Sequence, residues 1–295
     1  MVWYWLISKK YQCKKIIIPF GFITILCSCI FVSGIFYDFS YDGQSYHQAT
    51  VLQLINGFNP VYDKVGGTLF NITETDPRAA ELNAAALYKI TGNIEKSKSS
   101  NMVLIITTFL IALATILSVT KIKIEKSLVI AFLIAVNPVS IYQSLSYMVD
   151  GQFACLIACF LFLIWFISKK SNYLTLISLA TTSILMINIK ATGFTYTLIF
   201  SVGFLAFLWV YQKEKIKLIS KYIGVAFFIG AIFVGYNPYV TNTLEHNNPF
   251  YLIPFLGSVS SVGGATDLLS VQDVPANFHN QPSFVNLIRS VFSHQ

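Results

Sequence analysis

The chain has 295 residues, of which 55% are hydrophobic and 11% are charged, and its mean hydropathy is +0.64. A soluble domain carries about 25% charged residues, so this composition excludes an ordinary soluble protein and indicates a polytopic membrane protein. The formal net charge is +7. Because the basic residues cluster between apolar runs, we attribute this charge to membrane topology and not to nucleic-acid binding.

Apolar runs that approach the length needed for a hydrocarbon core of about 30 Å occur throughout the first 236 residues. The longest run, 174–210, would form a helix of roughly 55 Å. We expect it to break near Asn188, Lys190 and Gly193, where a charge and a flexible residue make a break least costly. The sequence therefore predicts an all-α membrane protein with about seven spans, at 16–36, 102–119, 128–142, 153–168, 174–188, 193–210 and 222–236. The Asn137-Pro138 pair should bend the third of these spans.

Lysines mark the side of the membrane on which each loop lies. With the N-terminus inside, the inside segments hold Lys9, Lys10, Lys14, Lys15, Lys121, Lys123, Lys126, Lys169, Lys170, Lys213, Lys215, Lys217 and Lys221. Among the acids, only Glu125 and Glu214 lie there. The positive-inside rule thus predicts a multi-pass protein of the plasma membrane, such as a bacterial inner membrane, with a cytoplasmic N-terminus. The transmembrane domain is 1–236, with an outer loop at 38–100, and 237–295 forms an outer C-terminal segment.

The outer loop contains two predicted amphipathic helices. The first covers 46–56 and ends at Gly57, and the second has Asp76 as N-cap, Pro77 at its first position and Gly92 at its end. Their apolar stripes consist of Ala49, Leu52 and Ile55 in the first helix, and of Ala79, Leu82, Ala86 and Ile90 in the second. Because both are too short and too polar to span, we expect them to lie flat on the outer interface.

Charged residues recur at the predicted outer ends of three separate spans. Asp42 follows the first span, Asp150 follows the third, and Lys190 separates the fifth from the sixth. A charge at the centre of a membrane helix costs about 2.5 to 3.5 kcal/mol, so such charges usually face one another or a wet cavity. Asp38 is a rival to Asp42, but its place at the end of the first span suggests an interfacial charge that stops the helix.

These features together resemble the GT-C superfamily of polytopic glycosyltransferases, closest to the protein O-mannosyltransferases and the lipid A aminoarabinose transferase. The resemblance rests on the first span, the loop YDGQSYHQA, two interfacial helices and the Thr-Gly-Asn that ends the second. It implies that Asp42 is the catalytic acid and that Asp150 of MVDGQ is the second outer acid. It also matches Arg78 of DPRAAEL and Lys190 of NIKATG to basic residues of the family.

The chain departs from the family at several positions. Gly43 stands where a second acid often occurs, Ala79-Ala80 replaces a double proline, and Asn83 replaces an aromatic residue. Family members usually have more spans and often a soluble C-terminal domain. The resemblance, which covers roughly 37–193, therefore implies a truncated or divergent member.

The implied activity is transfer of a sugar from a polyprenyl-phosphate donor to a hydroxyl of a glycan, lipid or protein acceptor. Asp42 would take the hydroxyl proton, with inversion at the anomeric carbon, while Lys190 and Arg78 would stabilise the leaving phosphate. Tyr46 and His47 complete the candidate substrate site. No cofactor is assigned, although a divalent cation is compatible with the chemistry. Membrane lipids are expected partners and nucleic acid is not.

Two other classes of protein remain open. A transporter or flippase of envelope lipids would also carry intramembrane charges, but no inverted repeat is evident. A membrane subunit without catalytic activity is the other alternative. Acids that face one outer cavity favour a transferase, whereas acids distributed across the bilayer favour transport. In the outer C-terminal segment, His246 and Arg289 are assigned to the solvated surface.

Overall fold

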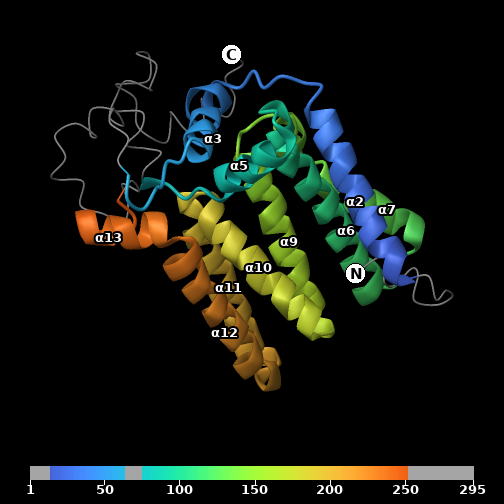
Figure 1. Cartoon of the computed structure of the whole chain (residues 1–295). Helices are drawn as coiled ribbons and strands as arrows, with labels where there is room; N and C mark the ends of the chain where they lie inside the picture. Colours follow the sequence, from blue (N-terminus) through green and yellow to red (C-terminus); the bar gives the residue numbers. More distant parts are fainter. Residues whose placement is uncertain (1–13, 64–74, 252–295) are drawn as a thin grey trace, which may run out of the picture. The chain divides into compact units, whose positions relative to one another are not determined.

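The computed structural model describes residues 14–63 and 75–251, and within these ranges every regular element is a helix (Figure 1). The long helices are α2 (Lys14–Ser33), α6 (Ser100–Val119), α9 (Asp150–Lys169), α10 (Tyr173–Ile189), α11 (Ala191–Tyr211) and α12 (Lys213–Phe228). The shorter helices are η1 (Gly43–His47), α3 (Gln48–Ile55), α5 (Ala79–Thr91), η2 (Glu95–Ser99), α7 (Ile124–Ala135), α8 (Pro138–Tyr142), η3 (Ile229–Val234), η4 (Tyr236–Val240) and α13 (Thr241–His246). The predicted all-α fold is therefore confirmed for the described residues.

Four helical segments are long and apolar enough to cross a membrane, judged by length and composition: Glu95–Val119, Asp150–Lys169, Ala191–Tyr211 and Lys213–Val234. Two further apolar helices, Pro19–Ser33 and Tyr173–Ile189, are shorter. These helices indicate a membrane protein. They do not confirm the count of seven spans, because α10 has 17 residues and α7 has 12.

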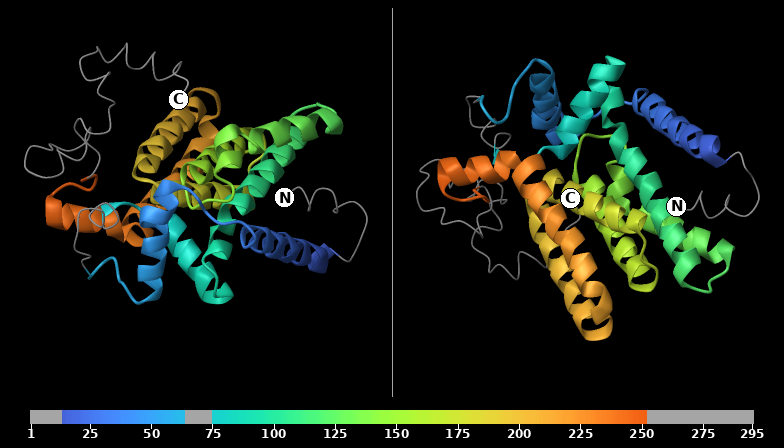
Figure 2. Two further views of the ribbon diagram at one scale, coloured as in Figure 1. Left: turned by 90° about the horizontal axis from the view of Figure 1, so that it is seen from above. Right: turned by 60° about the horizontal axis from the view of Figure 1, so that its bottom comes forward.

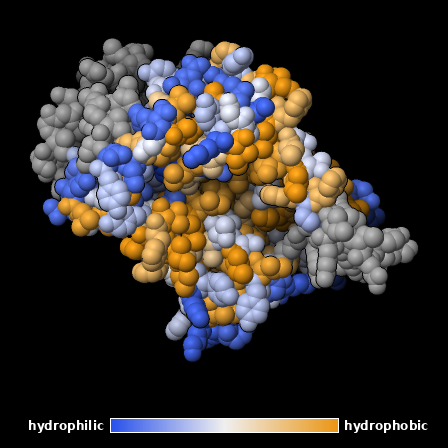
Figure 3. Space-filling model, viewed as in Figure 1, coloured by the Kyte–Doolittle hydropathy of each residue, from blue (hydrophilic) through white to orange (hydrophobic). Residues whose placement is uncertain are grey.

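The apolar surface of the helices also indicates a membrane environment. Many large apolar side chains on the outer faces of the helices are exposed, among them Phe20, Phe31, Phe132, Leu133, Ile199, Trp209 and Phe233. Figure 3 shows apolar residues across the middle of the visible face and hydrophilic residues near α3 and at the opposite tip. Exposed apolar surface on this scale is unusual for a soluble monomer, and lipid would cover it.

The core lies between α9, α10, α11 and α12. Its largest fully buried side chains include Phe160, Ile167, Leu176, Leu179, Leu208 and Ile219, which come from all four helices. α9 also packs against α6, and α10 packs against α12. Figure 2 shows α11 and α12 as an antiparallel pair beside α10. This packing fixes the ends of α9 and α10, where the candidate site residues lie.

The predicted break in the run 174–210 is confirmed at Lys190. This residue ends α10 and precedes α11, and its extended backbone (φ −157°, ψ 146°) interrupts the helix. Gly193 permits the tight junction, because a Cβ atom there would lie 1.9 Å from the Met186 carbonyl oxygen. The lysine is thus held at a helix junction instead of within a continuous span.

The predicted bend at Asn137-Pro138 is also confirmed, and it separates α7 from α8. The Asn137 side chain caps α8 by accepting a hydrogen bond from the Ser140 backbone N–H at 3.0 Å. Pro138 follows at the first helical position, where it has no hydrogen bond to lose.

The two short helices of the outer loop form, with two corrections. Gly57 and Gly92 end them with positive φ, as expected. However, the assignment of Asp76 as N-cap and Pro77 as first position is wrong, because α5 begins at Ala79 and Arg78 is its N-cap residue. Asp76 and Arg78 instead line a cavity.

The second correction concerns the face of α5 that meets the protein. Ala80, Glu81 and Ala84 are buried, whereas Leu82 and Ile90 of the predicted apolar stripe are exposed. Ala84 packs with Val51 of α3 and with Tyr147, so the two outer helices share a small core of their own. In Figure 1 these helices lie near the N-terminal end of α9 and the C-terminal end of α10.

Candidate functional site

A cavity of about 100 Å³, open to solvent, lies where α5 and the loop that follows α2 meet the ends of α9 and α10. It is lined by Asp42, Tyr46, His47, Thr50, Asp76, Pro77, Arg78, Glu81, Met148, Val149, Asp150, Ile189 and Lys190. Every residue that the sequence placed in the site is among them. Segments far apart in the chain therefore contribute polar groups to one site at one end of the apolar helices.

Lys190 and Asp150 form an ion pair inside this cavity. The Lys190 Nζ atom lies 2.5 Å from Asp150 Oδ1, and the side chains are 42% and 44% exposed. Asp150 is the first residue of α9, and Lys190 occupies the α10–α11 junction. Since a half-exposed pair is partly solvated, its net contribution to stability is small, about 0 to 1 kcal/mol. The pair is suited to exchange partners with an anionic ligand.

Among the acids that line the cavity, Asp42 is the best placed to react with a ligand. It is partly exposed in the cavity wall, directly before η1. Within the part of the chain that the structure describes, its carboxylate accepts no side-chain hydrogen bond, and the Ser45 hydroxyl donates to its backbone carbonyl oxygen at 3.5 Å. A carboxylate without internal donors can accept a hydrogen bond from a ligand hydroxyl.

A π-helical turn shapes the wall that follows Asp42. η1 is closed by the Gln48 backbone N–H, which donates to the Gly43 carbonyl oxygen. An α-helix has about 3.6 residues per turn, so its fifth residue lies on the same face as the first, whereas its sixth is rotated by about 140°. The wider π-turn rotates His47 back toward the face of Asp42, and Asp42, Tyr46 and His47 all line the cavity. The sequence predicted a helix only from Tyr46, and its apolar periodicity gives no sign of the extra residue.

His47 makes its strongest contact with Glu81, a residue that the sequence analysis did not select. His47 Nδ1 lies 2.5 Å from Glu81 Oε1, and the side chains are 6% and 9% exposed. The pair joins η1 to α5. An acid on the otherwise small and apolar buried face of α5 was the available signal for Glu81.

Asp76 is the second acid that the sequence analysis missed as a site residue. Burial, followed by the nearby Glu81 carboxylate, raises the pKa of Asp76 from its ordinary value to about 6. Arg78, Lys190 and His47 oppose this shift. Burial, followed by the carboxylate of Asp42, likewise raises the pKa of the Tyr46 hydroxyl. Tyr46 therefore keeps its proton and can donate a hydrogen bond.

Arg78 brings a fixed positive charge to the cavity wall. Its side chain is buried, and the guanidinium carbon lies 5.8 Å from the centre of the Phe58 ring. This cation–π contact orients a group that is suited to oxyanions. The cavity thus contains cations from two segments, Arg78 before α5 and Lys190 after α10.

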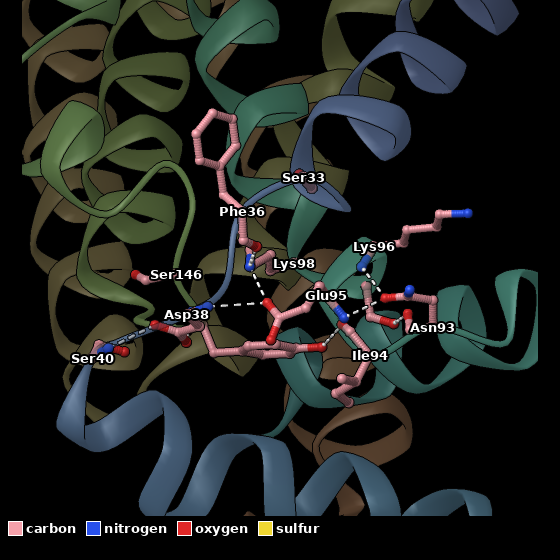
Figure 4. Close-up of polar contacts among 12 residues, drawn as sticks. Ser33, Phe36, Asp38, Ser40, Asn93, Ile94, Glu95, Lys96, Lys98 and Ser146 are labelled. Carbon is pink, nitrogen blue, oxygen red and sulfur yellow. Dashed lines mark hydrogen bonds and ion pairs between the residues drawn. The ribbon is translucent and has the colours of Figure 1, made fainter.

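Asp38 has a structural position, so its interpretation as an interfacial charge is wrong. It is 2% exposed, and its carboxylate accepts hydrogen bonds from the backbone N–H groups of Ser40 and Tyr147, each at 2.8 Å. Figure 4 shows this carboxylate beside a buried ion pair between Glu95 and Lys98. The buried carboxylate joins the first outer loop to the segment before α9.

The same network secures the segment that follows α2. The Asp38 backbone N–H donates to Glu95 Oε2 at 3.1 Å, and Lys98 donates to the Phe36 carbonyl oxygen at 2.5 Å. Gly43 must remain small, because a Cβ atom there would lie 2.1 Å from Asp38 Oδ2. This contact leaves no room for a side chain at position 43.

A metal site is not evident among the described residues. Within 14–63 and 75–251, no group of three or more His, Cys, Asp or Glu side chains could hold a metal ion. The predicted outer segment 237–295 is described only to residue 251, where α13 contacts the outer loop through the Asn242 side chain and the Thr75 carbonyl oxygen at 3.1 Å. Arg289 lies outside the described residues.

Comparisons with models of known protein families, with characterised proteins and with solved structures give no match for this chain.

Proposed function

We propose that this chain is a membrane glycosyltransferase of the GT-C type. It transfers a sugar from a polyprenyl-phosphate donor to an acceptor hydroxyl at the outer face of the membrane, with inversion at the anomeric carbon. The observation that carries the proposal is the cavity that collects Asp42, Asp150, Arg78 and Lys190 from separate segments at one end of the apolar helices. A base and two cations facing the same space are the groups that this reaction needs.

The proposed chemistry begins at Asp42. Its carboxylate takes the proton from the acceptor hydroxyl as the hydroxyl oxygen attacks the anomeric carbon. The bond between that carbon and the phosphate oxygen breaks, and its electron pair stays on the phosphate. The lack of an internal hydrogen bond on the Asp42 carboxylate, within the described residues, supports this role.

The leaving phosphate needs positive charge as the bond breaks. Lys190 provides it by exchanging Asp150 for the phosphate, and Asp150 holds the ammonium in the cavity when no donor is bound. Arg78 adds a second cation from the segment before α5, where its guanidinium packs on the Phe58 ring. Charge that is held in place before reaction stabilises the transition state without reorganisation.

We further propose seven spans with the N-terminus inside. The proposal is supported by the overlap of each predicted span with a helix or a pair of helices: α2, α6, α7 with α8, α9, α10, α11, and α12 with η3. The lysine-rich loops then lie inside, and the cavity opens outside, where only lipid-linked sugars are available as donors. Polar groups gathered at one end of the helices favour a transferase over a transporter, whose sites lie near the middle of the bilayer.

Comparative mass spectrometry of envelope glycans and lipids, with and without the gene for this chain, tests the proposal. Loss of one glycosylated species in the deletion strain, together with accumulation of a polyprenyl-phosphate sugar, is the expected result. Complementation with the natural chain should restore the species. An envelope profile that is identical in both strains would contradict the proposal.

A further inference from the structure

The His47–Glu81 pair has no role in the reaction as described above. Both side chains are almost fully buried, and both line the cavity that contains Asp42. The contact is also close, because His47 Nδ1 lies 2.5 Å from Glu81 Oε1. Simple cross-linking of η1 to α5 would not require a titratable pair.

The contact with Glu81 defines which histidine nitrogen is available to the cavity. A neutral imidazole has one nitrogen that donates and one that accepts, and the partner of one nitrogen sets the role of the other. Glu81 at Nδ1 favours a proton on that atom and leaves Nε2 as the acceptor. Within the described residues, Nε2 has no hydrogen-bond partner. His47 therefore presents a proton acceptor that the fold does not use.

His47 and Asp42 flank the same π-turn, and both line the cavity. Asp42 directly precedes η1 and His47 ends it. The ring of Tyr46, whose centroid is 4.2 Å from that of His47, covers the imidazole from one side. The neighbouring charged groups in the cavity are Asp76, Arg78, Asp150 and Lys190, and Lys98 lines a smaller space behind the pair with Tyr147.

We propose that His47, oriented by Glu81, carries away the proton that Asp42 removes from the acceptor hydroxyl. This inference rests on the proposed function. After the sugar has moved, the proton passes from the Asp42 carboxyl group to His47 Nε2, and the carboxylate is regenerated. The resulting imidazolium is stabilised by the Glu81 carboxylate, and the proton then leaves to water. No bond other than those to this proton changes in the step.

The test uses the full chain in nanodiscs, with a panel of undecaprenyl-phosphate hexoses and pentoses as donors. We expect His47→Ala to lower kcat about a hundredfold, the range in which a proton-transfer group contributes, and to leave the KM for the donor unchanged. Added imidazole should restore at least a tenth of the lost rate, because the small base can occupy the vacated space. Glu81→Gln should lower kcat about tenfold, as outer partners of a functional histidine do, without rescue by imidazole.

A matched control comes from the second described His–Glu pair, His246 and Glu245, which are 4.0 Å apart and partly exposed outside the cavity. His246→Ala should leave kcat unchanged. If His47→Ala fails to insert, His47→Gln replaces it, since the amide still donates to Glu81, and the same loss of kcat is expected.

Three results would overturn the inference while the proposed function stands. These are an unchanged kcat in the His47 variants, a raised KM with normal kcat, which would make His47 a donor ligand, and a loss of kcat that imidazole does not restore. If the natural chain transferred none of the sugars, the proposed function would fail and the inference would fall with it.

Discussion

Two acids four residues apart in the first outer loop have opposite physical roles. The Asp38 carboxylate accepts hydrogen bonds from the backbone N–H groups of Ser40 and Tyr147, so it stabilises the fold. Asp42 faces a cavity and has no such donors among the described residues. The sequence favoured Asp42 by its distance from the span end, but only the fold shows why Asp38 is unavailable.

Lys190 should matter for binding far more than for stability. Its ion pair with Asp150 is half-exposed and contributes little to folding. Charge-assisted hydrogen bonds contribute about 1.5 to 3 kcal/mol, so Lys190→Met should weaken binding of undecaprenyl phosphate about ten- to a hundredfold. Binding to nanodisc-embedded protein measures this directly.

The melting temperature of the Lys190→Met protein should stay close to that of the natural chain. Lys190→Arg, which keeps the charge, is the matched variant and should retain most of the affinity. If the Met variant and the natural chain bound undecaprenyl phosphate with equal affinity, Lys190 would only extend its ammonium group to the membrane interface and would not bind the phosphate.

Asp76 should make stability depend on pH. Its pKa is about 6 in the folded protein, against an ordinary value of 3.8. Between these values the folded state holds a proton that the unfolded state has lost, so the contribution of this proton to stability is complete below about pH 3.8 and is lost as pH rises past 6. Asp76→Asn should therefore gain stability, relative to the natural chain, as pH rises from 4 to 8.

Melting temperatures of both proteins at pH 4, 6 and 8, in the same detergent, test this assignment. The difference between variant and natural chain should grow toward pH 8. A difference that is constant across the three pH values, or that is largest at pH 4, would be inconsistent with a proton held by Asp76.

At the scale of single elements, the junction between α10 and α11 depends on one glycine. A Cβ atom at Gly193 would lie 1.9 Å from the Met186 carbonyl oxygen, whereas one at Gly203 in the same helix would meet nothing within 4 Å. Gly193→Ala should thus destabilise the protein by about 1 to 3 kcal/mol, as overpacking does. It should also displace Lys190 and weaken binding of undecaprenyl phosphate.

Gly203→Ala is the control within the same helix. Alanine is favoured over glycine inside a helix by about 0.8 to 1.0 kcal/mol, so this variant should be neutral or more stable. Thermal unfolding of the two variants side by side measures the contrast. Similar behaviour of both would mean that the close approach at Gly193 does not constrain the junction.

The elements also show where sequence reasoning succeeds and where it ends. Charge and chain length predicted the break at Lys190, and glycines predicted the ends of the two outer helices, because these signals are local. The π-turn of η1 and the late start of α5 at Ala79 were missed. Both depend on packing between segments distant in the chain, and Glu81 becomes a site residue only through that packing.

At the scale of the whole molecule, topology is the property that most needs an independent test. Reporter fusions that end at Lys170 and at Asn247 should report inside and outside respectively, because an odd number of proposed spans separates them. Fusions at Asp63 should agree with those at Asn247. Reporters at Lys170 and Asn247 that lie on the same side would contradict the proposed seven-span topology.

The central claim is that Asp42 is the base in transfer of a sugar from a polyprenyl-phosphate donor. The most direct measurement is the rate of transfer from undecaprenyl-phosphate sugars by the natural chain and by Asp42→Asn, each in nanodiscs. Asparagine keeps the shape and removes the base, so the rate should fall about a hundred- to ten-thousandfold. Asp63→Asn, which alters an exposed acid in the same loop outside the cavity, should transfer normally. Transfer at the natural rate by a correctly inserted Asp42→Asn protein would contradict the account.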